Sequence, residues 1–258
     1  MNDSFLFLGT SDGRSCWQRA HTSSLLEARG TRILLDCGEP CSRALCDRGL
    51  VPEGIHAIFL SHLHSDHVGG LPMLIQNLWL AKRRSPLPIY MPREGIAPLK
   101  RWLHTCYLCD CLMPFRLDFR PWRAGKTFRW KNLRVRAIRN RHLEGLRRLC
   151  ERPPAGESLS FRFEWGRRSL VWSADIYGPE DLAPLLAPPT ETLVCELAHF
   201  SPETLFRDLA PRRFKKLVLT HLGEKALRRL PGLRRLAAKM LPGKTVLFAR
   251  DGFRMPLP

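Results

Sequence analysis

The chain has 258 residues, of which 44% are hydrophobic and 26% charged, a composition that excludes predominant disorder. Its 42 basic and 24 acidic residues give a formal net charge of +18, which favours anionic partners such as nucleic acid or phosphorylated metabolites. The cations gather in two blocks, residues 81–150 and 211–258. A charge count does not place side chains on one face, so a solvated basic surface stays open as the alternative to a polyanion-binding track.

The N-terminal segment Met1–Ser4 lacks a basic stretch followed by a long apolar run, so we expect no signal peptide. No apolar run approaches the roughly 18 residues that a transmembrane helix needs. We therefore expect a cytoplasmic protein that crosses no membrane and keeps its nine cysteines reduced.

Apolar runs and turn residues predict alternating strands and helices in the first half of the chain. The predicted strands are Ser4–Leu8, Ser24–Ala28, Thr31–Asp36, Ala57–Leu60 and Pro86–Met91, and the predicted helices are Arg43–Arg48, Leu71–Arg83 and Ile96–His104. We expect a loop directly after Ala57–Leu60, and an irregular segment over Cys106–Pro121.

The second half continues the alternation of strands and helices. Its predicted strands are Thr127–Trp130, Leu133–Ile138, Ser158–Trp165, Ser169–Trp172, Leu193–Glu196, Lys216–Leu219 and Lys244–Ala249, and its predicted helices are Pro179–Leu186, Pro202–Leu209 and Glu224–Lys239. Two series of strands with interspersed helices indicate an α/β protein built in layers. Since no linker, repeat or low-complexity tract divides the chain, we expect a single domain over residues 1–258.

The loop expected after Ala57–Leu60 contains three histidines and an aspartate, His62, His64, Asp66 and His67. In an extended segment His62 and His64 project to the same side, and a turn at Ser65 brings the other two to an adjacent centre. Imidazole and carboxylate are the ligands expected for zinc, with manganese or iron as alternatives. The competing interpretation is a polar loop whose histidines cap nearby backbone, and the density of ligand-type residues disfavours it.

The segment 57–70, AIFLSHLHSDHVGG, resembles the signature of the metallo-β-lactamase superfamily. The resemblance extends along nearly the whole chain, and it implies a four-layer αββα sandwich with a dinuclear metal centre. It also implies further ligands after later strands, in the order histidine, aspartate, histidine. Carried over residue by residue, His62, His64 and His142 hold one ion, Asp66, His67 and His221 hold the other, and Asp175 bridges them.

Four short segments resemble the ribonuclease Z branch of that superfamily, whose members are endonucleases and phosphodiesterases: Phe7–Thr10, Leu35–Glu39, Pro88–Tyr90 and Leu219–His221. The branch has a tRNA-gripping arm between the motifs matched here by His142 and Asp175. Only residues 143–174 separate these positions, which leaves no room for the arm and argues against tRNA processing.

The ribonuclease Z branch also uses a glutamate and a histidine as a proton-donating pair. Glu196 and His199 are the candidates here, at a shorter spacing than in the family, and the alternative is a strand-end glutamate and a histidine that bond nearby backbone. With Asp66 they form the predicted catalytic set. The implied reaction is an in-line attack at phosphorus by a hydroxide that bridges two divalent ions, Zn²⁺ by ligand type and Mn²⁺ or Fe²⁺ as alternatives.

The resulting prediction is a ribonuclease Z-like phosphodiesterase acting on RNA or another phosphodiester, with a homodimer left open. One alternative is a superfamily hydrolase of a small thioester or lactone. Another is a nucleic-acid-binding protein with a vestigial site, which the complete ligand set disfavours. Cys106, Cys109 and Cys111, with His104 nearby, form an incomplete zinc set and are interpreted as packing or loop thiols.

Overall fold

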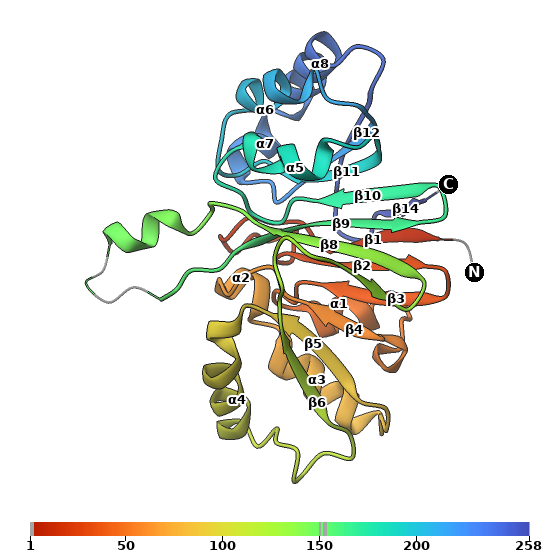
Figure 1. The fold of residues 1–258 in the computed structure, drawn as a ribbon, viewed down its shortest axis with the longest axis vertical. Coiled ribbons are helices and arrows are strands. Elements are labelled where there is room, and N and C mark those ends of the chain that lie inside the picture. The colour runs from red at the N-terminus through yellow and green to blue at the C-terminus, as the bar shows by residue number, and fades with distance from the viewer. Residues whose placement is uncertain (1–2, 150, 152–153, 258) are drawn as a thin grey trace. The chain divides into compact units, whose positions relative to one another are not determined.

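The structure is a computed structural model that describes residues 3–149, 151 and 154–257. Met1 and Asn2, which begin the segment used to predict the absence of a signal peptide, lie outside the described residues. The chain forms two compact units, Met1–Trp122 with Arg250–Pro258, and Arg123–Ala249. Each unit is built around one seven-stranded mixed sheet (Figure 1).

The sheet of the first unit has the order β14-β1-β2-β3-β4-β5-β6. Its strands are β1 (Ser4–Gly9), β2 (Ser23–Ala28), β3 (Thr31–Leu35), β4 (Ala57–Phe59), β5 (Leu87–Met91), β6 (Leu117–Pro121) and β14 (Arg254–Pro256). Strands β2 and β3 form a hairpin whose two turn residues, Arg29 and Gly30, have φ of 50° and 71°, as a tight primed turn requires. From β3 to β6 the pairing is parallel.

Helices cover the first sheet through one apolar core. They are α1 (Cys41–Cys46), α2 (Ser65–Val68), α3 (Leu71–Leu80) and α4 (Ile96–Thr105), with single 3₁₀ turns η1 (Pro52–Gly54) and η2 (Arg93–Gly95). Helix α3 buries Leu71, Leu74, Ile75 and Leu78, the spacing of an amphipathic helix. These side chains pack with Ile58 and Ile89 of the central parallel strands, and this core fixes where β4 ends.

The second unit repeats the combination of an antiparallel and a parallel half-sheet, in the order β13-β12-β11-β10-β9-β8-β7. Its strands are β7 (Thr127–Trp130), β8 (Leu133–Arg139), β9 (Leu159–Trp165), β10 (Arg168–Trp172), β11 (Thr190–Glu196), β12 (Phe214–Thr220) and β13 (Thr245–Phe248). The pairing is antiparallel from β7 to β10 and parallel from β10 to β13.

The helices of the second unit are α5 (Ala183–Leu186), α6 (Pro202–Leu209), α7 (Glu224–Arg228) and α8 (Leu230–Met240), with 3₁₀ turns η3 (Glu144–Arg148) and η4 (Pro179–Leu182). Ser201 caps helix α6 at its N-terminus, because its side chain accepts a hydrogen bond from the backbone N–H of Thr204. Leu205, Phe206 and Leu209 of α6 are buried in the core that covers this sheet. Helix packing therefore anchors β11 and β12, whose carboxyl ends carry polar residues.

The α/β prediction is confirmed, with local differences. The helix predicted over Pro179–Leu186 is the 3₁₀ turn η4 followed by α5. The segment predicted as irregular contains β6, which ends in Pro121 at a sheet edge, where proline is tolerated. The loop after β4 contains α2, and β14 was not predicted because its partner β1 lies at the other end of the chain. The helix predicted over Glu224–Lys239 is two helices, since Pro231 fits only the first turn of α8. Among the described residues, no helix has the length and apolar character to cross a bilayer.

Candidate metal centre

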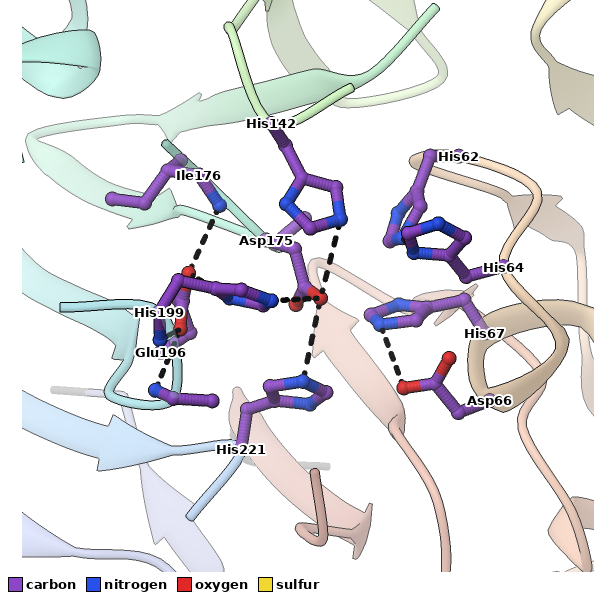
Figure 2. A network of polar contacts seen from close by, with 12 residues as sticks. His62, His64, Asp66, His67, His142, Asp175, Ile176, Glu196, His199 and His221 are labelled. Carbon is purple, nitrogen blue, oxygen red and sulfur yellow. Dashed lines mark hydrogen bonds and ion pairs between the residues drawn. The ribbon is translucent and has the colours of Figure 1, made fainter. Parts of the chain in front are cut away.

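In the first unit, polar side chains gather where parallel strands β3 and β4 end. Asp36 follows β3, and the chain beyond β4 supplies the first ligand cluster, defined as His62, His64, Asp66 and His67 (Figure 2). The carboxyl ends of parallel strands meet at one edge of a sheet, the usual position of functional groups in α/β folds. Helix α2 holds Asp66 and His67 in its single turn, so the local fold brings the four side chains together.

Asp36 organises two of these histidines from within the core. Its side chain is 0% exposed and accepts hydrogen bonds from the Ser61 backbone N–H (2.7 Å), from the Ser61 hydroxyl (2.8 Å) and from Nδ1–H of His67 (2.5 Å). Since the Ser61 hydroxyl donates to Asp36, it accepts from Nδ1–H of His62 at 3.0 Å. Both imidazoles therefore keep the proton on Nδ1 and present an Nε2 lone pair, the form that binds a metal.

Burial raises the pKa of the Asp36 carboxyl, and attraction to His67 with the hydrogen bonds from His67 and Ser61 acts in the opposite direction. The left-handed φ of 55° at Asp36 is uncommon for a residue with a side chain. Strain of this kind persists where surrounding contacts over-determine a conformation. Here those contacts are the bonds that orient His62 and His67.

Gly38 is required where the loop after β3 meets α2. A Cβ at this position would lie 2.1 Å from the carbonyl oxygen of Asp66, far closer than any side chain tolerates. The nearby backbone bonds Cys37 N–H to the His67 carbonyl at 2.7 Å. This close packing fixes α2 against the end of β3.

The second ligand cluster, defined as His142, Asp175 and His221, lies in the second unit (Figure 2). Asp175 and His221 follow the parallel strands β10 and β12, and His142 follows β8. Oδ2 of Asp175 lies 3.3 Å from Nε2 of His221 and 3.7 Å from Nε2 of His142. All three side chains are almost fully buried. One carboxylate oxygen thus faces two imidazole nitrogens.

Backbone strain and an asparagine hold the second cluster. Ala174 and His221 have φ of 48° and 53°, so both parallel-strand ends turn sharply at the ligand. Asn140 donates from Nδ2 to the Asp175 carbonyl at 2.9 Å, and its Oδ1 accepts the His142 backbone N–H at 3.1 Å. Asn140 therefore ties the loop that carries His142 to the strand end that carries Asp175.

Glu196 and His199 form a pair beside the second cluster. Glu196 is 1% exposed and lies 2.8 Å from Nδ1 of His199, whose side chain is 37% exposed. The carboxylate also accepts backbone N–H bonds from Ile176, Ala198 and His199. Nδ1–H of His199 donates to Glu196, which leaves Nε2 facing Oδ2 of Asp175 at 4.0 Å. The arrangement suits either a ligand or a proton carrier.

The donor atoms fit a divalent metal in chemistry and in spacing. Bonds of about 2.0–2.2 Å in tetrahedral geometry place two ligands of one zinc ion about 3.3–3.6 Å apart. Within the first cluster, Nε2 of His62 lies 3.1 Å from Nδ1 of His64, and Nε2 of His67 lies 3.5 Å from Oδ2 of Asp66. The pairs around Asp175 have similar separations. Each cluster therefore presents nitrogen and carboxylate donors at ligand spacing.

The structure brings together, within each unit, the residues predicted as ligands there. Sequence reasoning missed Asp36, which hydrogen-bonds His67 and Ser61, and Asn140, which bonds the backbone of Asp175 and His142. The position of Asp36 at the end of a strand that pairs with β4 was an available signal, whereas nothing local distinguished Asn140. Cys106, Cys109 and Cys111 belong to none of the clusters of described side chains that could hold a metal ion. The sulfurs of Cys109 and Cys111 nevertheless lie 2.9 Å apart.

A family model described as "Anti-Pycsar protein Apyc1" matches residues 4–222 of the chain. Ribonuclease Z from Methanothermobacter thermautotrophicus is 39% identical over 116 residues, which are 44% of this chain and 34% of that protein. The chain thus matches about a third of the length of that relative.

Two solved structures are similar over nearly the whole chain. The metallo-β-lactamase fold protein YhfI from Bacillus subtilis has a TM-score of 0.79 at 18% identity and covers 99% of both chains. The short form of human tRNase Z has a TM-score of 0.75 at 20% identity, also covering 99% of both. The predicted metallo-β-lactamase fold is confirmed, as is the resemblance to ribonuclease Z in sequence.

Proposed function

The chain belongs to the family described as Anti-Pycsar protein Apyc1, and from that membership and the two ligand clusters we propose a metal-dependent hydrolase of phosphodiester bonds that acts on RNA or a nucleotide. The carboxylate of Asp175 carries the proposal, because its Oδ2 faces Nε2 of both His142 and His221 at ligand spacing. Such an oxygen suits a carboxylate shared by two ions, as in two-metal hydrolytic sites.

As the resemblance to the superfamily implies, we propose that the residues of both clusters serve as ligands of one dinuclear centre. His62, His64 and His142 would hold one ion, Asp66, His67 and His221 would hold the other, and Asp175 would contribute to both. Histidine nitrogen and carboxylate oxygen favour Zn²⁺, with Mn²⁺ or Fe²⁺ as alternatives. When bound, the ions would activate a water and neutralise charge on the phosphate. Asp66 would also orient the attacking water.

His199 is proposed to protonate the leaving oxygen. Its Nδ1 is held 2.8 Å from the buried Glu196, and a buried carboxylate stabilises the imidazolium form from which Nε2 can donate a proton. Glu196 is a positioning residue in this scheme. We expect His199→Ala to lower turnover by about 10²–10⁴-fold while metal content is kept. Loss of metal in this variant would instead assign His199 to coordination.

Positive charge supports a polyanionic substrate. Helices α7 and α8 and the residue between them expose six cations, Lys225, Arg228, Arg229, Arg234, Arg235 and Lys239. Within these two helices the only acidic residue is Glu224, which pairs with Arg228. Arginine and lysine on one helical segment attract phosphates, and such binding weakens as salt displaces it. Binding of RNA should therefore fall steeply between about 50 mM and 200 mM salt, and salt-independent binding would contradict a polyanionic substrate.

The matched relatives are named ribonuclease Z, and their similarity covers a limited part of their length. The segment between His142 and Asp175 contains η3, β9 and β10, which leaves no tRNA-gripping arm among its described residues. We therefore propose RNA or nucleotide phosphodiesters as the substrate class and do not extend the proposal to tRNA.

Metal content and substrate panels test the proposed function. The purified protein should bind two divalent ions and hydrolyse bis(4-nitrophenyl) phosphate. Turnover of this diester should exceed turnover of thioesters and lactones, because the positive charge of the protein attracts the anionic phosphodiester and does not attract a neutral ester group. His64→Ala and Asp175→Ala should abolish it. Preferential hydrolysis of a thioester or lactone would establish the alternative carbonyl chemistry, and metal-free protein with no turnover after metal addition would refute both.

We keep three wider expectations as proposals. Residues 1–258 act as one domain, because ligands of each proposed ion come from both units, and calorimetry should then give one unfolding transition that shifts with metal. Sedimentation should decide between monomer and homodimer. A cytoplasmic location agrees with the free thiols among the described cysteines.

A further inference from the structure

The loop between β1 and β2 passes beside the first ligand cluster. A methyl group added at Gly13 would lie 3.5 Å from Oδ2 of Asp66, so only about the space of one methyl group separates the loop backbone from that carboxylate. Side chains that follow Gly13 are therefore close to where a phosphate would bind under the proposed function.

Asp251 anchors both arms of this loop. Its Oδ1 accepts the Thr10 hydroxyl at 2.7 Å, and its Oδ2 accepts the Ala20 backbone N–H at 2.6 Å. Arg19 donates from Nη1 to Oγ1 of Thr10 at 2.7 Å. An isolated bridge between Cys16 and Arg19 closes the tip. These contacts therefore hold the loop in a defined hairpin conformation.

Trp17 sits at the tip of the hairpin and is 98% exposed. Tryptophan normally buries a large apolar area, and Trp102, another exposed tryptophan, shows 42%. Four neighbours of Trp17 in the loop are also exposed: Arg14 is cationic, and Ser15, Cys16 and Gln18 are uncharged. An indole beside an arginine on an anchored turn combines a stacking surface with a phosphate-attracting charge.

We propose that Trp17 determines substrate selection by stacking on a nucleobase of the phosphodiester while its phosphate lies at Asp66. This inference rests on the proposed function and extends it. Four residues of extended chain reach at most about 14 Å from Gly13 to Trp17, a span that a nucleotide unit and its neighbour can bridge. Arg14 lies between the two in the chain and is exposed, so it adds a positive charge along this stretch of the loop. The ligand class is therefore a base-bearing phosphodiester rather than any diester.

Matched substrates separate base recognition from chemistry. Thymidine 5′-(4-nitrophenyl phosphate) and methyl 4-nitrophenyl phosphate share a leaving group and differ in the nucleoside. Stacking worth about 1–3 kcal/mol per base corresponds to a change of about 5- to 150-fold. Trp17→Ala should raise KM for the thymidine ester by that factor with kcat nearly unchanged, and should leave the methyl ester unaffected. Trp17→Phe should restore most of the loss.

Tyr107 provides a control, since it is 77% exposed and follows α4. The side chain of Leu63 touches Gly95 at the start of α4, and ten residues of helix carry Tyr107 about 15 Å away. Tyr107→Ala should leave KM for both esters unchanged. An equal effect of Trp17→Ala on both esters, or no effect on either, would overturn the inference.

Binding supplies a readout that needs no turnover. A 2′-O-methyl oligouridylate of ten nucleotides should bind more tightly than an abasic decamer of the same charge, and Trp17→Ala should remove this difference. If both esters resist hydrolysis and the base-dependent binding is still lost in Trp17→Ala, the proposed hydrolysis fails, whereas the stacking of Trp17 on a nucleobase is supported. Equal binding of the two decamers by the unmodified protein would refute the inference itself.

Discussion

Asp36→Asn isolates the contribution of one buried carboxylate to metal binding. The amide introduced by this substitution would keep an oxygen for the Ser61 backbone N–H, and would place an NH₂ group where Oδ2 now accepts from Ser61 and His67. A donor would then face the Nδ1–H of His67. To accept a hydrogen bond from this NH₂ group, the imidazole of His67 must move its proton from Nδ1 to Nε2. The shift removes the Nε2 lone pair that would bind the metal.

The size of the effect follows from these bonds. Two hydrogen bonds to a charged acceptor are lost, each worth about 1.5–3 kcal/mol. Rotation of the Ser61 hydroxyl and the proton shift on His67 regain roughly one of them, so the metal-free variant should lose about 1.5–3 kcal/mol of unfolding free energy. Metal affinity should fall about 10- to 100-fold, the usual effect of losing a residue that orients a ligating histidine.

Zinc competition with a chromophoric chelator measures the affinity, and urea unfolding of the metal-free protein measures the stability. Glu27→Gln is the matched control, because it removes a partly buried carboxylate of the same sheet that lies away from the ligands. It should lower stability and leave zinc affinity unchanged. Zinc affinity within twofold of the unmodified protein in Asp36→Asn would refute the role assigned to Asp36.

Three further outcomes are expected. Although burial alone raises the pKa of Glu27, hydrogen bonds from Arg254 and Ser4 hold it below its ordinary 4.5. The loss of about 1 kcal/mol or less in Glu27→Gln should therefore be present above pH 4.5 and vanish as pH falls through the lower folded value; equal losses at pH 3 and pH 7 in urea unfolding would contradict this. Zinc at 100 times its dissociation constant should add about 2.7 kcal/mol, a rise in Tm of roughly 5–11 °C that a chelator reverses, and an unchanged Tm in calorimetry would count against the metal centre. Phe206→Ala should cost about 3–5 kcal/mol, because Phe206 on α6 is fully buried in the core of the second unit; chemical denaturation giving under 1 kcal/mol would show that this core is not packed as described.

Local sequence was sufficient for the alternation of strands and helices and for the first ligand cluster. His62, His64, Asp66 and His67 lie within one strand end and one helical turn, so their spacing alone indicated their proximity. The last predicted helix differs from the structure only by a break, since α7 ends at Arg228 and Pro231 lies in the first turn of α8, where proline is tolerated. Strand β14 was not predictable in this way, since a three-residue strand becomes stable only by pairing with β1.

The sequence by itself determined which residues have metal-ligand chemistry and the order in which they occur. The tertiary structure alone decided that Asp36, 31 positions before His67, sets the protonation of two imidazoles. It likewise decided that Asn140 ties His142 to Asp175, and that Trp17 stands exposed on a loop anchored to Asp251. These contacts join residues far apart in the chain. Hydrogen bonds of that kind depend on where parallel strands end in a folded sheet, which no local pattern of residues encodes.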